Sequence, residues 1–130
     1  MNNIELVSTH LCMTKDIGVA HNLFGGYMMC WLDEAGAIYA RGVTNEENVV
    51  TIKFEEIVFK QPVKVRDIIK IYCGDPVIGE SSVTFTIMAK VRGKIVCQTK
   101  CVFVAVTSLG YKKRIECPRF PREDKDEKTV

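Results

Sequence analysis

The sequence predicts an α+β fold in which a curved antiparallel β-sheet of about five strands wraps around one long central α-helix. Two observations carry this prediction. Residues 24–41 form a segment that is apolar almost throughout and has the length of a helix. After residue 48 the hydrophobic pattern changes to a period of two, which is typical of half-buried strands. The 130 residues suffice for one such domain with a substantial core.

The helix is expected to begin at Phe24 or Gly25 and to end at Arg41. Asn22 is the expected N-terminal capping residue, and Gly42 is the expected C′ residue beyond the last turn. Arg41 would then lie where a cation interacts favourably with the helix dipole.

This helix is apolar nearly all round, since eleven of the fourteen residues 27–40 are apolar. Such a helix must be buried on most of its sides, and one sheet covers only one of them. The pattern therefore predicts that a second subunit covers the remaining surface and that the protein is at least a dimer.

The expected strands flank the helix in the sequence, and the first of them is separated from it by a loop at residues 14–22. They are Ile4–Met13, Asn48–Phe59, Asp67–Gly74, Ser81–Arg92 and Lys94–Ser108. The last two would form a long hairpin that turns at Gly93-Lys94.

The chain divides into a domain at residues 1–115 and a charged tail at residues 116–130. From Tyr111 onward, prolines and a dense mixture of charges argue against packed structure. We expect the last ten residues or so to be mobile.

Composition excludes several kinds of partner. Eighteen basic and sixteen acidic residues give a net charge of +2, which is too balanced for a nucleic-acid-binding protein. No apolar run approaches the ~18 residues of a membrane span, and the N-terminus lacks the pattern of a signal peptide. We therefore expect no nucleic acid and no membrane as a partner.

The six cysteines are scattered and form no CxxC motif, and the two histidines complete no zinc-binding pattern. We expect no metal site. Five of the cysteines lie in apolar or strand-like segments, where free thiols behave as small hydrophobic groups and require a reducing compartment. The expected location is the cytoplasm.

A carboxylate inside the apolar helix is the strongest chemical signal. Asp33 lies seven residues after Gly26, almost two helical turns, so the two residues share one face of the helix. A buried carboxylate without partners costs several kcal/mol. Burial also raises the pKa of a carboxyl group, which suits a general base or acid near neutral pH. Glu34 points about 100° away and is expected to have a structural role.

The glycine pair Gly25-Gly26 at the start of the helix offers a second chemical group. Amides in the first turn have no acceptor within the helix, and the helix dipole adds partial positive charge there. Glycines allow a substrate to approach these amides, which could then stabilise an oxyanion. Gly26 and Asp33 are about 10 Å apart along the helix, too far to act on one carbonyl. If both act on it, they come from different subunits of a two-fold dimer.

The order of these motifs resembles the hotdog-fold acyl-CoA thioesterases, most closely the short single-domain bacterial members. The resemblance covers roughly residues 5–115. It rests on FGG followed seven residues later by DEAGA, and on FKQPVKVRD (59–67) and GESSVTF (79–85). It implies the hotdog fold and hydrolysis of acyl-CoA to a free carboxylic acid and CoA. CoA is part of the substrate, so no cofactor is expected. It also implies assembly into hotdog dimers, and we favour a hexamer built as a trimer of dimers.

The resemblance also implies roles for particular residues. Asp33 would promote attack on the thioester carbonyl, and the amide of Gly26 or its neighbour would bind the carbonyl oxygen. The remaining candidates would bind CoA: Gly79, Ser81 and Ser82 beside the pantetheine arm, and Lys112, Lys113 and Arg114 near the phosphates.

One position departs from the family pattern. Relatives often have Asn-x-x-Gly ahead of the glycine pair, whereas Gly18 and His21 occupy these positions here. Asn22 or His21 is expected to take over the role of the missing asparagine. Thr51 is a further polar candidate beside Asp33.

The sequence leaves several alternatives open. The domain could be a non-catalytic acyl-CoA-binding or sensing module, with Asp33 only pairing across a subunit interface. A dehydratase of the same fold is disfavoured, because the region of Gly18 and His21 lacks the expected acid–histidine arrangement. Asp33 could be a general base or a nucleophile, and the length of the acyl chain is not determined.

Overall fold

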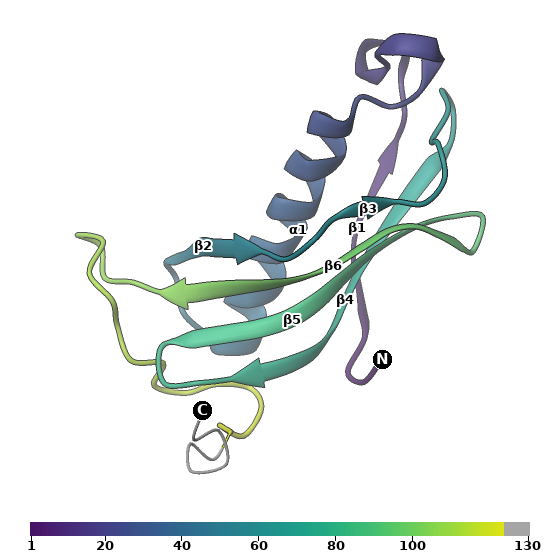
Figure 1. Ribbon diagram of the computed structural model, residues 1–130. Helices are drawn as coiled ribbons and strands as arrows, with labels where there is room; N and C mark the ends of the chain where they lie inside the picture. Colours follow the sequence, from purple (N-terminus) through teal and green to yellow (C-terminus); the bar gives the residue numbers. More distant parts are fainter. Residues whose placement is uncertain (124–130) are drawn as a thin grey trace.

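The computed structural model describes residues 1–123 and shows one long helix lying across an antiparallel sheet (Figure 1). The helix is α1 (Gly25–Thr44), and the strands are β1 (Glu5–Leu11), β2 (Val49–Phe54), β3 (Val58–Phe59), β4 (Ile68–Ile78), β5 (Ser82–Val91) and β6 (Lys94–Ala105). The strand order is β1-β4-β5-β6-β2, and β3 pairs with β6 beyond the end of β2. The predicted α+β class is confirmed, with six strands in place of about five.

The core lies between the sheet and one side of α1. Every second residue of the long strands points to the helix and is buried, for example Ile69, Ile71 and Ile87. Gly36 allows the closest approach, because a Cβ there would lie 2.9 Å from two ring atoms of Phe103. The residues of α1 on this side are also buried: Met28, Leu32, Ala35, Gly36, Tyr39, Ala40 and Val43. Each large apolar side chain buried in this way contributes about 1.5–3 kcal/mol to stability.

Both ends of the helix differ from the prediction. The N-cap is Phe24 and not Asn22, because the amides of Leu23 and Phe24 bond the carbonyls of Val63 and Asp16 and keep this segment extended. Gly42 is not the C′ residue.

The helix continues to Thr44, because Val43 and Thr44 are buried against the core. Asn45 then takes the left-handed conformation (φ 57°), and its side-chain amide donates to the carbonyl of Cys117 at 2.8 Å. Asparagine tolerates this conformation better than most residues.

Several strand boundaries are also corrected, and β1 and β6 are shorter than expected. The expected strand at 48–59 is divided into β2 and β3, and β4 continues through an irregularity between Gly74 and Val77 to Ile78. The hairpin turns at Arg92-Gly93, one residue earlier than expected, since Val91 pairs with Lys94. Both turn residues have positive φ (52° and 79°), as the tightest hairpin turn requires.

The segment after β6 returns across the end of the sheet. Ile115 is fully buried, and the Arg122 side chain donates to the carbonyls of Gly79 and Ile115. The amide of Arg119 bonds the carbonyl of Val43 at 2.8 Å. Ile115, Arg119 and Arg122 are therefore held against the helix and sheet, whereas no packed structure was expected after Tyr111. The predicted mobility of the last residues falls largely on 124–130, outside the described residues.

Candidate active site

Asp33 and Thr51 meet between the helix and the edge of the sheet. Thr51 lies on β2, and its Oγ1 donates a 2.6 Å hydrogen bond to Oδ1 of Asp33. Since a threonine hydroxyl donates only one proton, the second carboxylate oxygen keeps its full capacity to accept. The prediction that Thr51 is a polar neighbour of Asp33 is met by this geometry.

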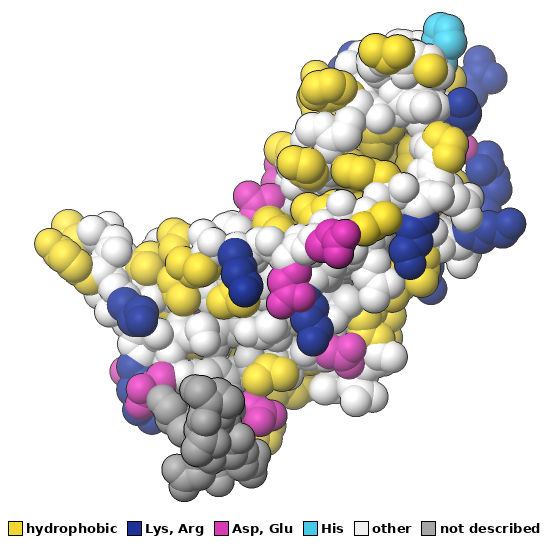
Figure 2. Space-filling view, viewed as in Figure 1, with side chains coloured by type: hydrophobic (Ala, Val, Ile, Leu, Met, Phe, Trp, Pro, Cys, Tyr) yellow, Lys and Arg dark blue, Asp and Glu magenta, His cyan; other side chains and the backbone are white. Residues whose placement is uncertain are grey.

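Within one chain Asp33 is exposed, which differs from the expectation of a buried carboxylate. The sheet covers only the opposite side of α1, so the side that carries Asp33 and Gly26 faces outward. Several large apolar side chains of α1 and β2 share this exposure: Tyr27 (44%), Met29 (47%), Ile38 (57%), Val50 (43%) and Ile52 (56%). In Figure 2 hydrophobic side chains gather on the surface of this part of the molecule. Residues 1–123 of one chain thus leave Asp33 uncovered.

Aromatic rings flank the glycine pair at the start of α1. A Cβ on Gly26 would lie 2.9 Å from Cε2 of Phe24, and a Cβ on Gly25 would lie 3.7 Å from Cζ of Phe59. Larger residues at Gly26 would therefore displace the Phe24 ring. These two rings could not be predicted to flank the glycines, because nothing in the local sequence pattern distinguishes them from core residues.

A cavity of about 300 Å³ opens beside Gly25. Its lining is mainly apolar, with contributions from Met28, Phe59 and Val63, and it includes the polar side chain of Asn22. Oδ1 of Asn22 is buried and has no hydrogen-bond partner among the described residues. His21 is exposed and does not line this cavity. Of the two candidates for the missing asparagine, Asn22 is the one beside the helix start.

The candidates for the pantetheine arm come together at the opposite end of the sheet. Gly79, Ser81, Ser82 and Lys112 line one cavity of about 360 Å³. The amide of Gly79 bonds the carbonyl of Ser82 at 2.7 Å, which fixes the turn between β4 and β5. The fold thus gathers four of the six predicted CoA-binding residues.

The other two predicted phosphate ligands are engaged in ion pairs. Lys113 Nζ lies 2.9 Å from Oε1 of the buried Glu46, and Arg114 lies 3.1 Å from Oε2 of Glu80. Lys113 also lies outside the cavity that holds Lys112. The three consecutive cations therefore point to different surroundings.

A histidine on β1 contacts the far edge of the exposed helix face. The ring of His10 stacks on Trp31 with centroids 4.5 Å apart. Burial lowers the pKa of His10, against the opposing influence of Glu34 and Asp16. Glu34 is exposed and has no part in the Asp33–Thr51 pair.

Other features bear on the class of site. Among residues 1–123 no group of three or more His, Cys, Asp or Glu side chains could hold a metal ion. All six cysteines are free, and burial raises the pKa of the Cys73 thiol to about 12. None of the described helices is long and apolar enough to cross a membrane.

Comparison with known proteins identifies the family. The model of the thioesterase superfamily matches residues 20–87. The chain belongs to this superfamily. This thioesterase is 32% identical over 108 residues to an uncharacterized acyl-CoA thioester hydrolase of Buchnera aphidicola subsp. Schizaphis graminum, covering 78% of this chain and 79% of the relative.

Two solved structures extend the comparison to the fold. A hexameric thioesterase from Yersinia pestis is 29% identical with a TM-score of 0.83, over 90% of this chain and 99% of that one. A hexameric hotdog-fold thioesterase of Campylobacter jejuni is 32% identical with a TM-score of 0.76, over 86% and 90%. The predicted hotdog fold and the predicted enzyme class, a thioester hydrolase, are confirmed.

Proposed function

We propose that this thioesterase hydrolyses acyl-CoA to a carboxylic acid and CoA at sites shared between two subunits. The observation that carries the proposal is the Asp33–Thr51 hydrogen bond on a helix face that one chain leaves uncovered. The relatives named as acyl-CoA thioester hydrolases support the substrate class.

Asp33 promotes attack on the thioester carbonyl. Oδ1 accepts from Thr51, which leaves Oδ2 to accept a proton from water or to attack the carbonyl carbon itself. With water as the nucleophile, its oxygen bonds the carbonyl carbon, the C–S bond breaks and the acid is released directly. With Asp33 as the nucleophile, the C–S bond breaks to leave an acyl–Asp33 anhydride, which water then hydrolyses to the acid and the free carboxylate. In both routes CoA leaves as a thiolate that takes up a proton. A second chain over this face would exclude bulk water from the carboxylate.

The amide of Gly26 stabilises the carbonyl oxygen of the substrate held by the partner's Asp33. The first turn of α1 supplies donors without intrahelical acceptors, and the helix dipole favours negative charge there. Asn22 binds water or the thioester, a role supported by its position in the cavity beside Gly25 and by its unpartnered Oδ1 among the described residues. The cavity of Gly79, Ser81, Ser82 and Lys112 accepts part of the CoA arm.

The matched variants Asp33→Asn and Glu34→Gln test the carboxylate. Each replaces an exposed acid of α1 by its amide. Asp33→Asn should lower kcat/KM by about a hundredfold or more with folding and assembly retained, whereas Glu34→Gln should have little effect. Retained turnover in Asp33→Asn would move the chemistry elsewhere. Binding of acyl-CoA by the wild type without thiol release would instead favour the binding module.

Mixed oligomers test the shared site. Asp33→Asn and Gly26→Val should each be inactive, because Val would displace the Phe24 ring and obstruct the helix start. After random mixing, half of the dimers hold both variants, and one of their two sites is intact. Activity should then return to about a quarter of the wild-type value. If activity does not return although subunit exchange has been verified, Asp33 and Gly26 of the same chain act on one substrate.

The assembly and location follow from the same comparison. The solved structures from Yersinia pestis and Campylobacter jejuni are hexamers, and we propose a trimer of hotdog dimers for this chain. Six free cysteines, four of them buried, fit a reducing compartment, and we propose the cytoplasm.

A further inference from the structure

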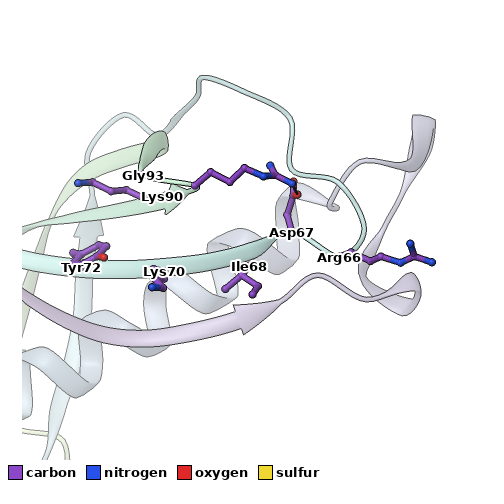
Figure 3. Close-up of a pocket in the computed structure, with 8 residues that line it drawn as sticks. Arg66, Asp67, Ile68, Lys70, Tyr72, Lys90 and Gly93 are labelled. Atoms are coloured by element: carbon purple, nitrogen blue, oxygen red, sulfur yellow. Dashed lines mark hydrogen bonds and ion pairs between the residues drawn. The ribbon is translucent and has the colours of Figure 1, made fainter.

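A third cavity, of about 440 Å³, opens on the face of the sheet that points away from α1 (Figure 3). On β4, Ile68, Lys70 and Tyr72 point to this face, while Ile69 and Ile71 between them are buried against the helix. The cavity is lined by Arg66, Asp67, Ile68, Lys70, Tyr72, Lys90, Arg92 and Gly93. None of these residues belongs to the site described above.

Two lysines lie directly opposite each other in this cavity. Lys70 on β4 is paired in register with Lys90 on β5. Side chains in such a pair leave the backbone about 5 Å apart, and like charges there destabilise the sheet. Lys90 Nζ is held 5.3 Å from the ring centroid of Tyr72. An anion between the two ammonium groups would remove the repulsion.

The single carboxylate of the cavity is already engaged. Asp67 is buried, and its two oxygens accept from Nη2 of Arg92 and from the amide of Lys64, both at 2.8 Å. This contact fixes Arg92 at the rim. No ion pair involves Lys70, Lys90 or Arg66 in the described part of the chain. Four cations against one acid leave a local charge of +3 (4 − 1).

The extent and the lining of the charged region limit the kinds of ligand that the cavity can bind. Only four of the eighteen basic residues line this cavity, and the net charge of the chain is +2, whereas a nucleic acid needs an extended basic surface. Arg66 points away from Lys70 and Lys90 in Figure 3, so direct contacts fall to the lysines and Arg92. Ile68, which is 51% exposed, and Tyr72 add an apolar wall. Phosphate groups carried by a flat organic moiety fit both features.

We propose that this cavity binds the phosphate groups of a nucleotide. Lys70 and Lys90 contact the phosphate from the two strands, Arg92 closes the site from the hairpin, and Ile68 and Tyr72 contact the base or sugar. Such phosphates have two sources, the nucleotide end of the acyl-CoA substrate or a separate nucleotide. The binding itself does not depend on the proposed role of Asp33.

Binding and thermal shift measurements on the full chain test the site. The probes are pyrophosphate and adenosine 3′,5′-bisphosphate, with adenosine as the uncharged control. Lys70→Gln and Lys90→Gln should each weaken binding of both phosphates by about fivefold or more, and abolish the rise in Tm that they cause. Asp33→Asn should bind them like the wild type, so failure of this site is distinguishable from failure of the proposed function.

Lys100→Gln is the matched control. Lys100 lies on the same outer face, opposite Thr86, and five residues along β6 from Ile95, the partner of Lys90. That separation is about 16 Å. This variant loses the same charge and should change the affinity less than twofold. Equal weakening by Lys100→Gln would show that net charge alone attracts the phosphates and would overturn the proposal, as would a lack of binding at millimolar concentrations.

Kinetics distinguish the two sources. If the cavity takes the nucleotide end of the substrate, Lys90→Gln raises KM for acyl-CoA and leaves KM for the corresponding acyl-pantetheine unchanged. If it takes a separate nucleotide, both KM values stay unchanged while binding of the bisphosphate is still weakened. Either kinetic result supports the site, provided that Lys70→Gln and Lys90→Gln weaken the binding of the phosphates.

Discussion

Thr51 Oγ1 on β2 donates a 2.6 Å hydrogen bond to Oδ1 of Asp33 on α1. The two residues are 18 positions apart in the sequence, and the contact joins the edge strand to the exposed face of the helix. It orients a carboxylate that the chain alone leaves open to solvent. In the proposed mechanism the hydroxyl selects which oxygen acts on the thioester.

Thr51→Val should therefore lower kcat by about tenfold, because the variant keeps the shape of the side chain and loses the donor to a charged group. KM should change little. Thr51→Ser retains the hydroxyl and should recover most of the activity. Steady-state kinetics on the two variants measure the difference, and equal kcat values for Val and Ser would remove Thr51 from the mechanism.

Two glycines of α1 should respond in opposite directions to the same change. Gly36→Ala places a Cβ 2.9 Å from Phe103 ring atoms and 3.1 Å from Cδ1 of Ile87, so it should destabilise the fold by about 1–3 kcal/mol. Gly42→Ala meets nothing closer than 3.9 Å and should stabilise the helix by about 0.5–1 kcal/mol. Urea denaturation of both variants measures this, and effects of the same sign would contradict the packing described.

The free energy of unfolding should fall at low pH partly because the carboxylate of Asp16 becomes protonated. The Met13 amide, and then Lys15, lower the pKa of this carboxyl below its ordinary value of 3.8. A carboxyl group whose pKa is lower in the folded than in the unfolded protein stabilises the fold. This contribution is complete above the pKa of the unfolded protein and is lost as the pH falls through the pKa of the folded protein.

Asp16→Asn should thus reduce the decline in the free energy of unfolding below about pH 4. Denaturation at several pH values checks this, with the exposed Glu47→Gln as control. A pH profile unchanged by Asp16→Asn would assign the acid sensitivity to other groups.

Self-association should depend on the exposed face of α1 and β2. Ile52 is 56% exposed on an edge strand beside Thr51, so Ile52→Lys would place a charge in the proposed dimer interface. We expect sedimentation to show smaller species and activity to fall with them. Leu109→Lys is the control, since Leu109 is 81% exposed in the turn after β6. An intact oligomer in Ile52→Lys would place the interface elsewhere.

The helix, its carboxylate and the alternating strands could all be predicted from the amino-acid sequence. Periodicity is a local property, so the apolar run around Asp33 and the alternation of β5 were readable without coordinates. The motif order of Gly26 and Asp33 also identified the family, which the comparison confirmed. Helix ends were less readable, because burial of Val43 and Thr44 outweighs the local preference for ending at Gly42.

Which residues far apart in the chain lie side by side depends on the three-dimensional fold. Strand register places Lys70 opposite Lys90, and the return of the chain after β6 brings Arg122 to Gly79. Register depends on the pairing of whole strands and not on any local pattern. For the same reason the exposure of Asp33 was decided by the fold, since the sheet covers one side of α1 and leaves the other open to solvent.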